Sequence, residues 1–341
     1  MMRLPSFDVA MPTTMPELLE NLRPNGHGVK IMAGGTDLLV NMKQGFHISH
    51  RLVWPGRVEE LRRISVQSDG EISIGAMATL SDVASSGAVK TAYPSISKAV
   101  LSIATPAIRN RATIGGNLCL DTRCYFYNES EFWRGSLGGC LKLNVAANDD
   151  GDFCHAAPGN AICSAVSSSD SPPILLALDA SVEIRSAQGK RIVPLSEFYA
   201  NDGMRFLNLA PGELLTRIIL PAPRQGLRSA HNKIRSRQSV DFPLANVGIA
   251  GVVEDGRVFT HLKIYVGAIQ SAPVRVRSAE ALLEDREATP VLIERAAEEA
   301  ALCVKPVPNI GGTVGYRKRM VAVLVKRTLG QILEVPREMT L

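Results

Sequence analysis

Two Gly-Gly loops constrain the fold of this chain more than any other feature of its sequence. The first is Ala33-Gly34-Gly35-Thr36-Asp37, at the end of the strand-like run Val29–Ala33, and the second is Thr113-Ile114-Gly115-Gly116-Asn117. Consecutive glycines carry no Cβ, so the backbone can approach a ligand closely and its N–H groups can converge on phosphate oxygens. Spacing alone leaves two alternatives open, which are a pair of ordinary tight turns and a pair of loops that bind a diphosphate.

Several functional classes are disfavoured by motif and charge. Neither loop has the spacing G-x-G-x-x-G or G-x-x-x-x-G-K-[ST], so two common nucleotide-binding folds are not supported. The net charge of +5 is spread thinly, which argues against nucleic acid as a partner. No run approaches the roughly 18 apolar residues of a membrane helix, and the first eight residues lack the apolar region of a secretory signal. We expect a cytoplasmic chain with reduced thiols.

Strand and helix patterns predict an α+β fold with more than one domain. Strand-like runs and helix-period runs alternate until Pro221-Ala222-Pro223-Arg224-Gln225-Gly226, a linker candidate because Pro and Gly cannot continue either regular element. We therefore predict domains over residues 1–223 and 227–341. In the first domain the expected strands are 29–33, 52–53, 72–76, 181–185 and 215–220, and the expected helices are 80–86 and 93–103.

The second domain is predicted to begin with a β-hairpin. Val247–Val253 and Val258–Ala268 flank Asp255-Gly256, a pair of residues typical of a tight hairpin turn. Helix-period runs over Val291–Cys303 and Val314–Leu329 follow. Strands followed by helices predict an antiparallel sheet with helices covering one face.

Five of the six cysteines lie between the second glycine loop and Asp170. Their spacing contains no C-x₂-C pair, so neither a zinc ribbon nor a plant-type [2Fe–2S] pattern is matched. Four separated thiolates can still bind a [4Fe–4S] cluster. From the residues alone, a cluster, a zinc ion and free or disulfide-bonded thiols remain open for the set Cys124, Cys140, Cys154 and Cys163.

The surroundings of these cysteines suggest further roles. Tyr125, Phe126, Tyr127, Phe132 and Trp133 could exclude water from a cluster or form the small core of the segment, and the two roles are compatible. His155 could be a ligand, although a position beside the site or on the surface fits it better. The remaining cysteines, Cys119 and Cys303, are expected to be buried as small apolar side chains.

Taken together, the two glycine loops in this order resemble those of the FAD-binding subunits of the molybdenum hydroxylase (xanthine dehydrogenase-type) family. Similarity extends to Ser169–Ala180, Lys233–Gly248 and Tyr316–Arg319, and so covers nearly the whole chain. The resemblance implies a PCMH-type FAD domain of two α+β subdomains and a smaller C-terminal α+β domain. It also implies that the catalytic chemistry lies on another subunit, so no catalytic residue is assigned here.

By match of motif, the resemblance assigns FAD-binding positions along both loops. Asp170 matches an acidic position near the adenosine, although it could be a simple turn former. Lys233 matches a basic position near the flavin ring, although a solvated strand lysine is an equal alternative. The full set of cofactor positions is Lys30, Ile31, Met32, Ala33, Gly34, Gly35, Thr36, Asp37, Thr105, Thr113, Ile114, Gly115, Gly116, Asn117, Asp121, Asp170 and Lys233.

The cysteine-rich insert, residues 118–168, is similar to that of the β subunits of 4-hydroxybenzoyl-CoA reductases. The resemblance implies a [4Fe–4S] cluster bound by Cys124, Cys140, Cys154 and Cys163, with a loop over 144–152 longer than expected. It further implies a heterotrimer with a molybdopterin-binding large subunit and a [2Fe–2S] small subunit, ferredoxin as electron donor, and formation of benzoyl-CoA. Two alternatives are a conventional molybdenum hydroxylase flavin subunit that passes electrons to NAD or a quinone, and a zinc-stabilised binding module.

Overall fold

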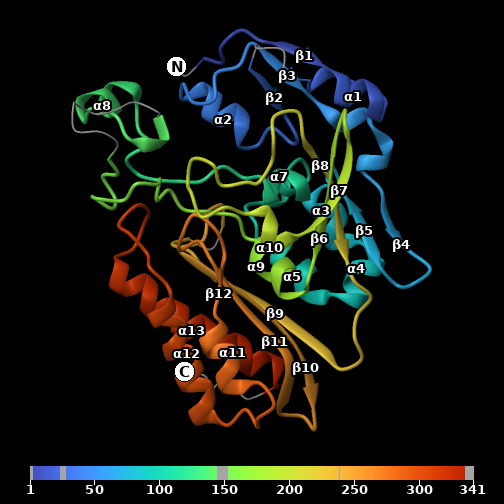
Figure 1. Ribbon diagram of the computed structural model, residues 1–341, viewed down its shortest axis with the longest axis vertical. Helices are drawn as coiled ribbons and strands as arrows, with labels where there is room; N and C mark the ends of the chain where they lie inside the picture. Colours follow the sequence, from blue (N-terminus) through green and yellow to red (C-terminus); the bar gives the residue numbers. More distant parts are fainter. Residues whose placement is uncertain (1–2, 24–27, 144–152, 238, 335–341) are drawn as a thin grey trace.

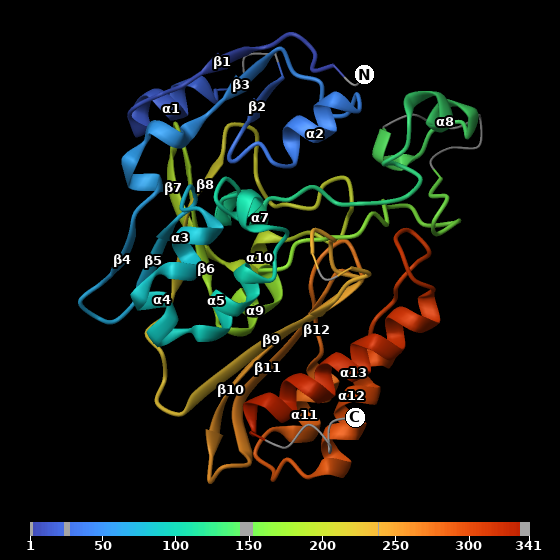
Figure 2. The same ribbon diagram turned by 180° about the vertical axis from the view of Figure 1, so that it is seen from behind.

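A computed structural model describes residues 3–23, 28–143, 153–237 and 239–334. Within these ranges the strands form three sheets, stacked along the long axis of the molecule (Figures 1 and 2). The chain begins in the small sheet at one end, passes through a larger central sheet, and finishes in a sheet-and-helix unit at the other end. This mixed α/β architecture with a separate C-terminal unit agrees with the predicted fold class.

The first sheet is parallel and small. Its strand order is β1 (Asp8–Ala10), β3 (Arg51–Val53), β2 (Val29–Ile31). Helices α1 (Met15–Asn21) and α2 (Leu38–Lys43) accompany it, and two short 3-10 turns, Pro55–Arg57 and Glu59–Leu61, lead to the next sheet. Because β2 ends at Ile31, the first glycine loop leaves the sheet at its carboxyl edge.

The central sheet is antiparallel. Its order is β4 (Ile64–Val66), β5 (Ile72–Gly75), β8 (Leu214–Leu220), β6 (Ser181–Ser186), β7 (Gly189–Pro194). Thr79 caps the first of its helices by accepting a hydrogen bond from the Asp82 backbone N–H, as capping residues commonly do. The helices of this unit are α3 (Leu80–Ser85), α4 (Gly87–Ala92), α5 (Pro94–Leu101), α6 (Pro106–Arg109), α7 (Ile114–Leu118), α9 (Pro172–Ala177) and α10 (Leu195–Phe198).

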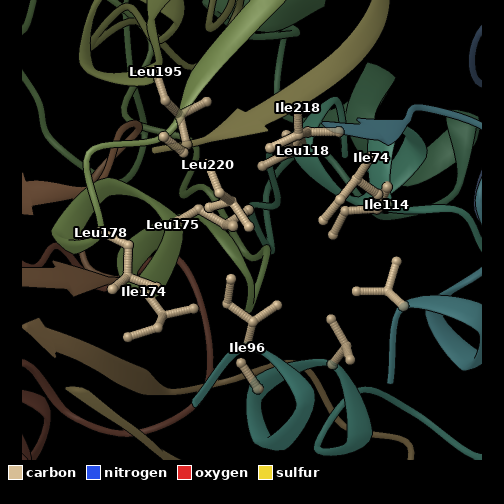
Figure 3. Packing of buried hydrophobic residues seen from close by; sticks show 14 of the residues in the cluster. Ile74, Ile96, Ile114, Leu118, Ile174, Leu175, Leu178, Leu195, Ile218 and Leu220 are labelled. Atoms are coloured by element: carbon tan, nitrogen blue, oxygen red, sulfur yellow. The ribbon is translucent and has the colours of Figure 1, made fainter. Parts of the chain in front are cut away.

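The largest hydrophobic core lies between this sheet and its helices. Figure 3 shows Ile74 and Ile218 of the sheet gathered with Ile96 of α5 and Leu175 of α9, and all four are almost completely buried. Each such side chain contributes about 1.5–3 kcal/mol by leaving water. Ile114 of the second glycine loop belongs to the same core, so the core fixes the position of that loop.

The C-terminal sheet is antiparallel, in the order β12 (Val274–Arg275), β11 (Val258–Gly267), β10 (Ala245–Glu254), β9 (Leu227–Ile234). Helices α11 (Arg277–Leu283) and α13 (Val314–Ile332) pack against it, and α12 (Pro290–Cys303) packs on these two helices, which confirms the predicted sheet with covering helices. At Gly248 a Cβ would lie 2.4 Å from the backbone of α9. The absence of a side chain there lets the central unit pack directly on this sheet.

The cysteine-rich insert forms a lobe that extends to one side of the molecule (Figures 1 and 2). It contains α8 (Glu131–Ser136) and a 3-10 turn, Leu141–Leu143, while the predicted long loop 144–152 lies outside the described residues. Several contacts tie the lobe to distant parts of the chain, and one at each side illustrates them. The Phe46 and Tyr127 ring centroids are 4.8 Å apart, and the Tyr125 N–H donates to the Asn309 carbonyl at 2.7 Å.

Candidate functional site

A cleft of about 560 Å³ lies where the two glycine loops meet. This volume is in the usual range for a cofactor or small-molecule site. Most residues predicted to bind the cofactor line the cleft, although they come from separate sheets and loops. These are Lys30, Ile31, Ala33, Gly34, Gly35, Thr36, Asp37, Thr113, Gly115, Gly116, Asn117, Asp121 and Asp170.

The two glycine loops contact each other directly. A Cβ on Gly34 would lie 2.1 Å from the Arg111 carbonyl oxygen, and one on Gly116 would lie 3.2 Å from the Ala33 Cβ. Gly35 has φ of +72°, a left-handed conformation that glycine adopts without steric cost. The packing of the loops therefore requires glycine at position 34 and favours it at positions 35 and 116.

Four of the predicted cofactor residues do not line the cleft, namely Thr105, Ile114, Met32 and Lys233. Thr105, Ile114 and Met32 instead make contacts that hold the fold together. Thr105 caps α6 by accepting a hydrogen bond from the Ile108 N–H at 3.4 Å. Ile114 is completely buried in the main core. The Met32 N–H donates to the Val53 carbonyl at 2.9 Å and so continues the pairing of β2 with β3. The fourth residue, Lys233, lies behind Asp170.

Asp170 and Lys233 form a buried ion pair at the base of the cleft. Their closest N–O distance is 2.9 Å, and the side chains are only 4% and 5% exposed. Burial raises the pKa of Asp170 to about 6, and the ammonium of Lys233 opposes this rise. His231, next to the pair, is also buried, and burial together with the Lys233 charge lowers its pKa to about 3. The pair thus places a carboxylate on the cleft wall and holds its counterion out of the cleft.

A second acidic residue of the cleft, Asp37, forms an ion pair with Arg123. Burial raises the pKa of Asp37, and the charge of Arg123 opposes the rise. Arg123 also donates to Asn41 Oδ1 at 3.2 Å and lies 5.0 Å from the ring centroid of Phe242. Arg123 and Phe242 line the cleft but were not predicted, because nothing in their local sequence marks them.

Asp121 is bonded on both carboxylate oxygens. Its Oδ2 lies 2.7 Å from His47 Nε2, and its Oδ1 accepts from Lys142 Nζ at 2.8 Å. Burial raises the pKa of Asp121, but the hydrogen bonds and charges of His47 and Lys142 outweigh burial and hold it well below its usual range. His47 lines the cleft and was missed by the sequence analysis, since it is 74 positions from Asp121 in the chain.

A second, small cavity of about 20 Å³ lies in the insert, and all four predicted ligand cysteines line it. Cys124, Cys140, Cys154 and Cys163 are each 7–9% exposed, and none forms a disulfide. Burial raises the pKa of Cys124 and of Cys163 to about 11, and neighbouring sulfurs add to the rise. The fold therefore gathers four free thiols that are separated along the chain by 15, 13 and 8 intervening residues.

The geometry around this cavity differs in part from expectation. Phe126 and Tyr127 line it, but Phe132 is 88% exposed and Tyr125 54%, so the predicted water-excluding shell consists of two of the five rings rather than all of them. No group of three or more His, Cys, Asp and Glu side chains in the described part of the chain is arranged to hold a single metal ion. His155 lines the cavity as a neighbour of the thiols, with its Nε2 2.8 Å from the Gly139 carbonyl.

The two remaining cysteines have different surroundings. Cys119 is partly buried against the main core, and burial raises its pKa to about 12. Cys303 is exposed, so the prediction of a buried position was wrong. It is the last residue of α12, beyond the last buried residue of that helix, Ala300. Among the helices described here, none is long and apolar enough to cross a membrane.

Comparison with known protein families matches both halves of the chain. Residues 5–223 match the family described as "FAD binding domain in molybdopterin dehydrogenase", and residues 230–332 match "CO dehydrogenase flavoprotein C-terminal domain". The chain belongs to the FAD-binding subunits of the molybdenum hydroxylase family. It is thus an oxidoreductase subunit, and the substrate chemistry of its family takes place on another subunit.

Individual relatives agree with this assignment. The flavin subunit is 33% identical over 265 residues to the aldehyde oxidoreductase FAD-binding subunit PaoB of Escherichia coli (strain K12), covering 75% of this chain and 79% of that one. It is 27% identical to the carbon monoxide dehydrogenase medium chain of Hydrogenophaga pseudoflava, covering 95% and 96%. A solved structure of carbon monoxide dehydrogenase from the same organism superposes with a TM-score of 0.79 at 25% identity, covering 98% and 99%. Such relatives are subunits of multi-subunit molybdenum hydroxylase complexes.

Proposed function

We propose that this flavin subunit also carries a [4Fe–4S] cluster and serves as the electron-transfer subunit of a molybdenum-containing 4-hydroxybenzoyl-CoA reductase. The observation that supports this proposal is the convergence of four buried, free thiols on one cavity of the insert. Ferredoxin would supply the electrons, and a [2Fe–2S] small subunit and a molybdopterin-binding large subunit would receive them. The large subunit would remove the phenolic hydroxyl to give benzoyl-CoA.

FAD, when bound, supplies one- and two-electron exchange. We propose that the glycine loops hold its diphosphate, with backbone N–H groups of residues 34–36 as donors. The N–H groups of residues 115–117 donate within the protein, so the second loop would contribute close backbone approach rather than N–H donors. The walls of the cleft are largely apolar side chains, which suits a flavin ring. We also propose the domain division 1–223 and 227–341, with the insert at 118–168, because the linker candidate lies between β8 and β9.

The donor set of the insert, four cysteine thiols, is one that both zinc and a [4Fe–4S] cluster use. Zinc takes four ligands on one ion, with sulfur at about 2.3 Å. As the side chains stand, no described group of His, Cys, Asp and Glu is arranged to hold a metal ion. A [4Fe–4S] cluster is held by four cysteine thiolates, one on each iron, so the sulfurs are spaced further apart. The cavity between the thiols has room for about one water. Binding a cluster would therefore require the cysteine side chains to turn outward and to release their protons.

A second function is supported by the named relatives. The flavin subunit is 28% identical to a subunit of the 6-hydroxypseudooxynicotine dehydrogenase complex of Paenarthrobacter nicotinovorans. Like the carbon monoxide dehydrogenase medium chain, this relative is named for the oxidation of a substrate. In that case the chain would be a conventional hydroxylase flavin subunit that passes electrons outward to NAD or a quinone, and the thiols would carry no iron.

Metal analysis separates the two functions. The full chain, expressed without other subunits and purified anaerobically, should contain flavin together with about four iron atoms and acid-labile sulfide. Low-temperature EPR of the dithionite-reduced chain should show a reduced-cluster signal that Cys124→Ser abolishes and the matched control Cys303→Ser retains. Flavin without iron in the wild-type chain would refute the cluster and favour the conventional hydroxylase.

The donor is tested separately from the cluster. Reduced ferredoxin should bleach the flavin of the iron-loaded chain faster than NADH does, and Cys124→Ser should lose the ferredoxin reaction while dithionite still reduces its flavin. Faster reduction by NADH, with no effect of the substitution, would contradict the reductase function.

A further inference from the structure

One buried cation lies between the two cavities. The side chain of Lys142 is 5% exposed and lines the cysteine cavity. Its ion-pair partner, Asp121, lines the cleft, with 2.8 Å between Lys142 Nζ and Asp121 Oδ1. The ion pair therefore joins the walls of the two sites, with Lys142 on the side of the cysteine cavity and Asp121 on the side of the cleft.

The contacts of Lys142 hold its ammonium in place. Nζ donates to Asp121 Oδ1 at 2.8 Å, to Thr122 Oγ1 at 2.6 Å and to the Gly203 carbonyl at 2.7 Å. An ammonium has three N–H donors, and all three are satisfied by these oxygens. A side chain that is buried with every donor satisfied keeps its charge at one position.

Two aromatic rings frame the same nitrogen, one from each site. Nζ lies 5.0 Å from the ring centroid of Tyr127, which lines the cysteine cavity, and 5.7 Å from that of Phe206, which lines the cleft. Such apolar surroundings lower the local dielectric, so the charge acts more strongly on its neighbours than it would in water. Cation–π attraction to both rings adds to its restraint.

The charges that face the cysteine cavity are few. Among the described residues that line it, Lys142 is the one lysine, arginine or carboxylate, and His155 is the one other titratable group besides the thiols and Tyr127. Asp121 offsets part of the positive charge, but its second oxygen is bonded to His47 on the cleft side. A cluster in this cavity would therefore have a fixed positive charge in its wall, and reduction adds one negative charge to a cluster.

We propose that Lys142 raises the reduction potential of the cluster and so sets the equilibrium for one-electron exchange with the flavin. This inference rests on the proposed function. In the exchange the cluster is oxidised by one electron and the flavin is reduced by the same electron, while Lys142 gains and loses neither electrons nor protons. Lys142 acts as a positioning residue, because its charge influences the cluster without taking part in the electron transfer. Nearby charge, hydrogen bonding and burial are the factors by which proteins set the reduction potentials of such clusters.

The test is a redox titration of the anaerobically purified full chain, following the cluster by EPR and the flavin by absorbance. Two neutral variants, Lys142→Gln and Lys142→Met, remove the charge, and Lys142→Arg keeps it. Lys190→Gln is the matched control, because Lys190 lies exposed on β7. Both neutral variants should shift the exchange equilibrium about tenfold toward the oxidised cluster, a fall in its potential of about 59 mV. Lys142→Arg should stay close to the wild-type potential, and Lys190→Gln should be unchanged.

The possible failures are distinguishable. Wild-type chain without iron would overturn the cluster and this inference together. A cluster whose potential is the same in wild type and in the neutral variants would overturn only the inference. Equal shifts in Lys142→Arg and Lys142→Gln would assign Lys142 a packing role and overturn the tuning role. Loss of iron from both neutral variants, with iron retained by Lys142→Arg, would overturn it in favour of a role in holding the cluster. If only one of the two neutral variants loads iron, the reduction potential of the cluster in that variant, compared with the wild type, decides whether Lys142 tunes the cluster.

Discussion

The glycine cleft and the cysteine cavity are neighbours, but they are built in different ways. The cleft is bounded by two loops that pack on each other and on the largest core, with backbone atoms where a side chain would otherwise be. The lobe has only a small buried cluster, and three of the cysteines belong to it. The comparison teaches that the cleft is shaped by backbone packing on a large core, whereas the lobe rests on a small apolar cluster, so the proposed cluster would contribute a larger share of its stability.

The largest effect is expected at the buried ion pair on the cleft side. Asp170→Asn leaves the ammonium of Lys233 buried without a counterion, which should lower the free energy of unfolding by about 3–5 kcal/mol. Adding Lys233→Met should recover much of this loss, because both charges are then gone. Denaturant unfolding of the single and double variants measures the difference. The exposed pair of Glu59 and Arg63 is the control, and Glu59→Gln should change nothing measurable.

Glycine substitution tests whether loop packing sets the shape of the cleft. In Gly34→Ala the new Cβ would lie 2.1 Å from the Arg111 carbonyl oxygen, so the loops must separate. We expect a loss of about 3 kcal/mol in stability and a purified protein nearly free of flavin. Gly87→Ala is the matched control, since no atom lies within 4 Å of its added Cβ. A Gly34→Ala protein with full flavin content would show that the cleft adapts to its ligand.

Iron removal should affect the lobe and leave the cleft intact. If the cluster binds only the folded lobe, hydrogen exchange in residues 118–143 and 153–168 should become about 100-fold faster after chelation, since ligand binding stabilises by mass action. Exchange in β10 and the flavin content should hardly change. Equal exchange in the lobe before and after chelation would mean that the apolar cluster alone stabilises it, and would remove the contrast between the two sites.

The most gradual effect, and the smallest for a change of one pH unit, is a pH dependence on the cleft side. The pKa of His231 is lowered from 6.5 to about 3, so below pH 6.5 the unfolded chain binds a proton that the folded chain does not. The free energy of unfolding should therefore fall as pH decreases, by up to about 1.4 kcal/mol per pH unit, and the contribution is fully present above pH 6.5. The raised pKa of Asp170 makes the free energy of unfolding rise as pH decreases, and it does so in both the wild type and His231→Asn. Subtracting the free energy of unfolding of His231→Asn from that of the wild type at each pH therefore isolates the contribution of the histidine. A constant difference from pH 7 to pH 4 would contradict this.

Elements with strong apolar periodicity were predicted well from the sequence. The helices expected at 291–303 and 314–329 are α12 and α13, and the hairpin around Asp255-Gly256 is β10 and β11. Strands β7 and β9 were not predicted. Gly189–Pro194 is largely exposed and Leu227–Ile234 is mostly polar, because each is an edge strand whose pairing is supplied by its neighbour. An apolar sequence pattern arises from side chains that are buried on one face of a strand. β7 and β9 bury too few side chains to show such a pattern.

The candidate site was predictable where its residues are adjacent in sequence. The two glycine loops carry their signal locally, and the structure brings them together in one cleft. His47, Arg123 and Lys142 were missed, because their partners Asp121 and Asp37 are distant in the chain and ion pairing leaves no local pattern. The four cysteines were found as a set, but only the fold shows that they face a common space.

Among the long-range contacts that hold the lobe, Phe46 packs on Tyr127 and the Asn309 carbonyl accepts a hydrogen bond from the Tyr125 N–H. Asn309 comes 146 positions after Cys163, the last of the four cavity cysteines. During synthesis, the cysteines therefore leave the ribosome long before the segment that completes their docking. If iron and sulfide are delivered to the docked lobe, delivery would follow the synthesis of residue 309 rather than that of the cysteines themselves.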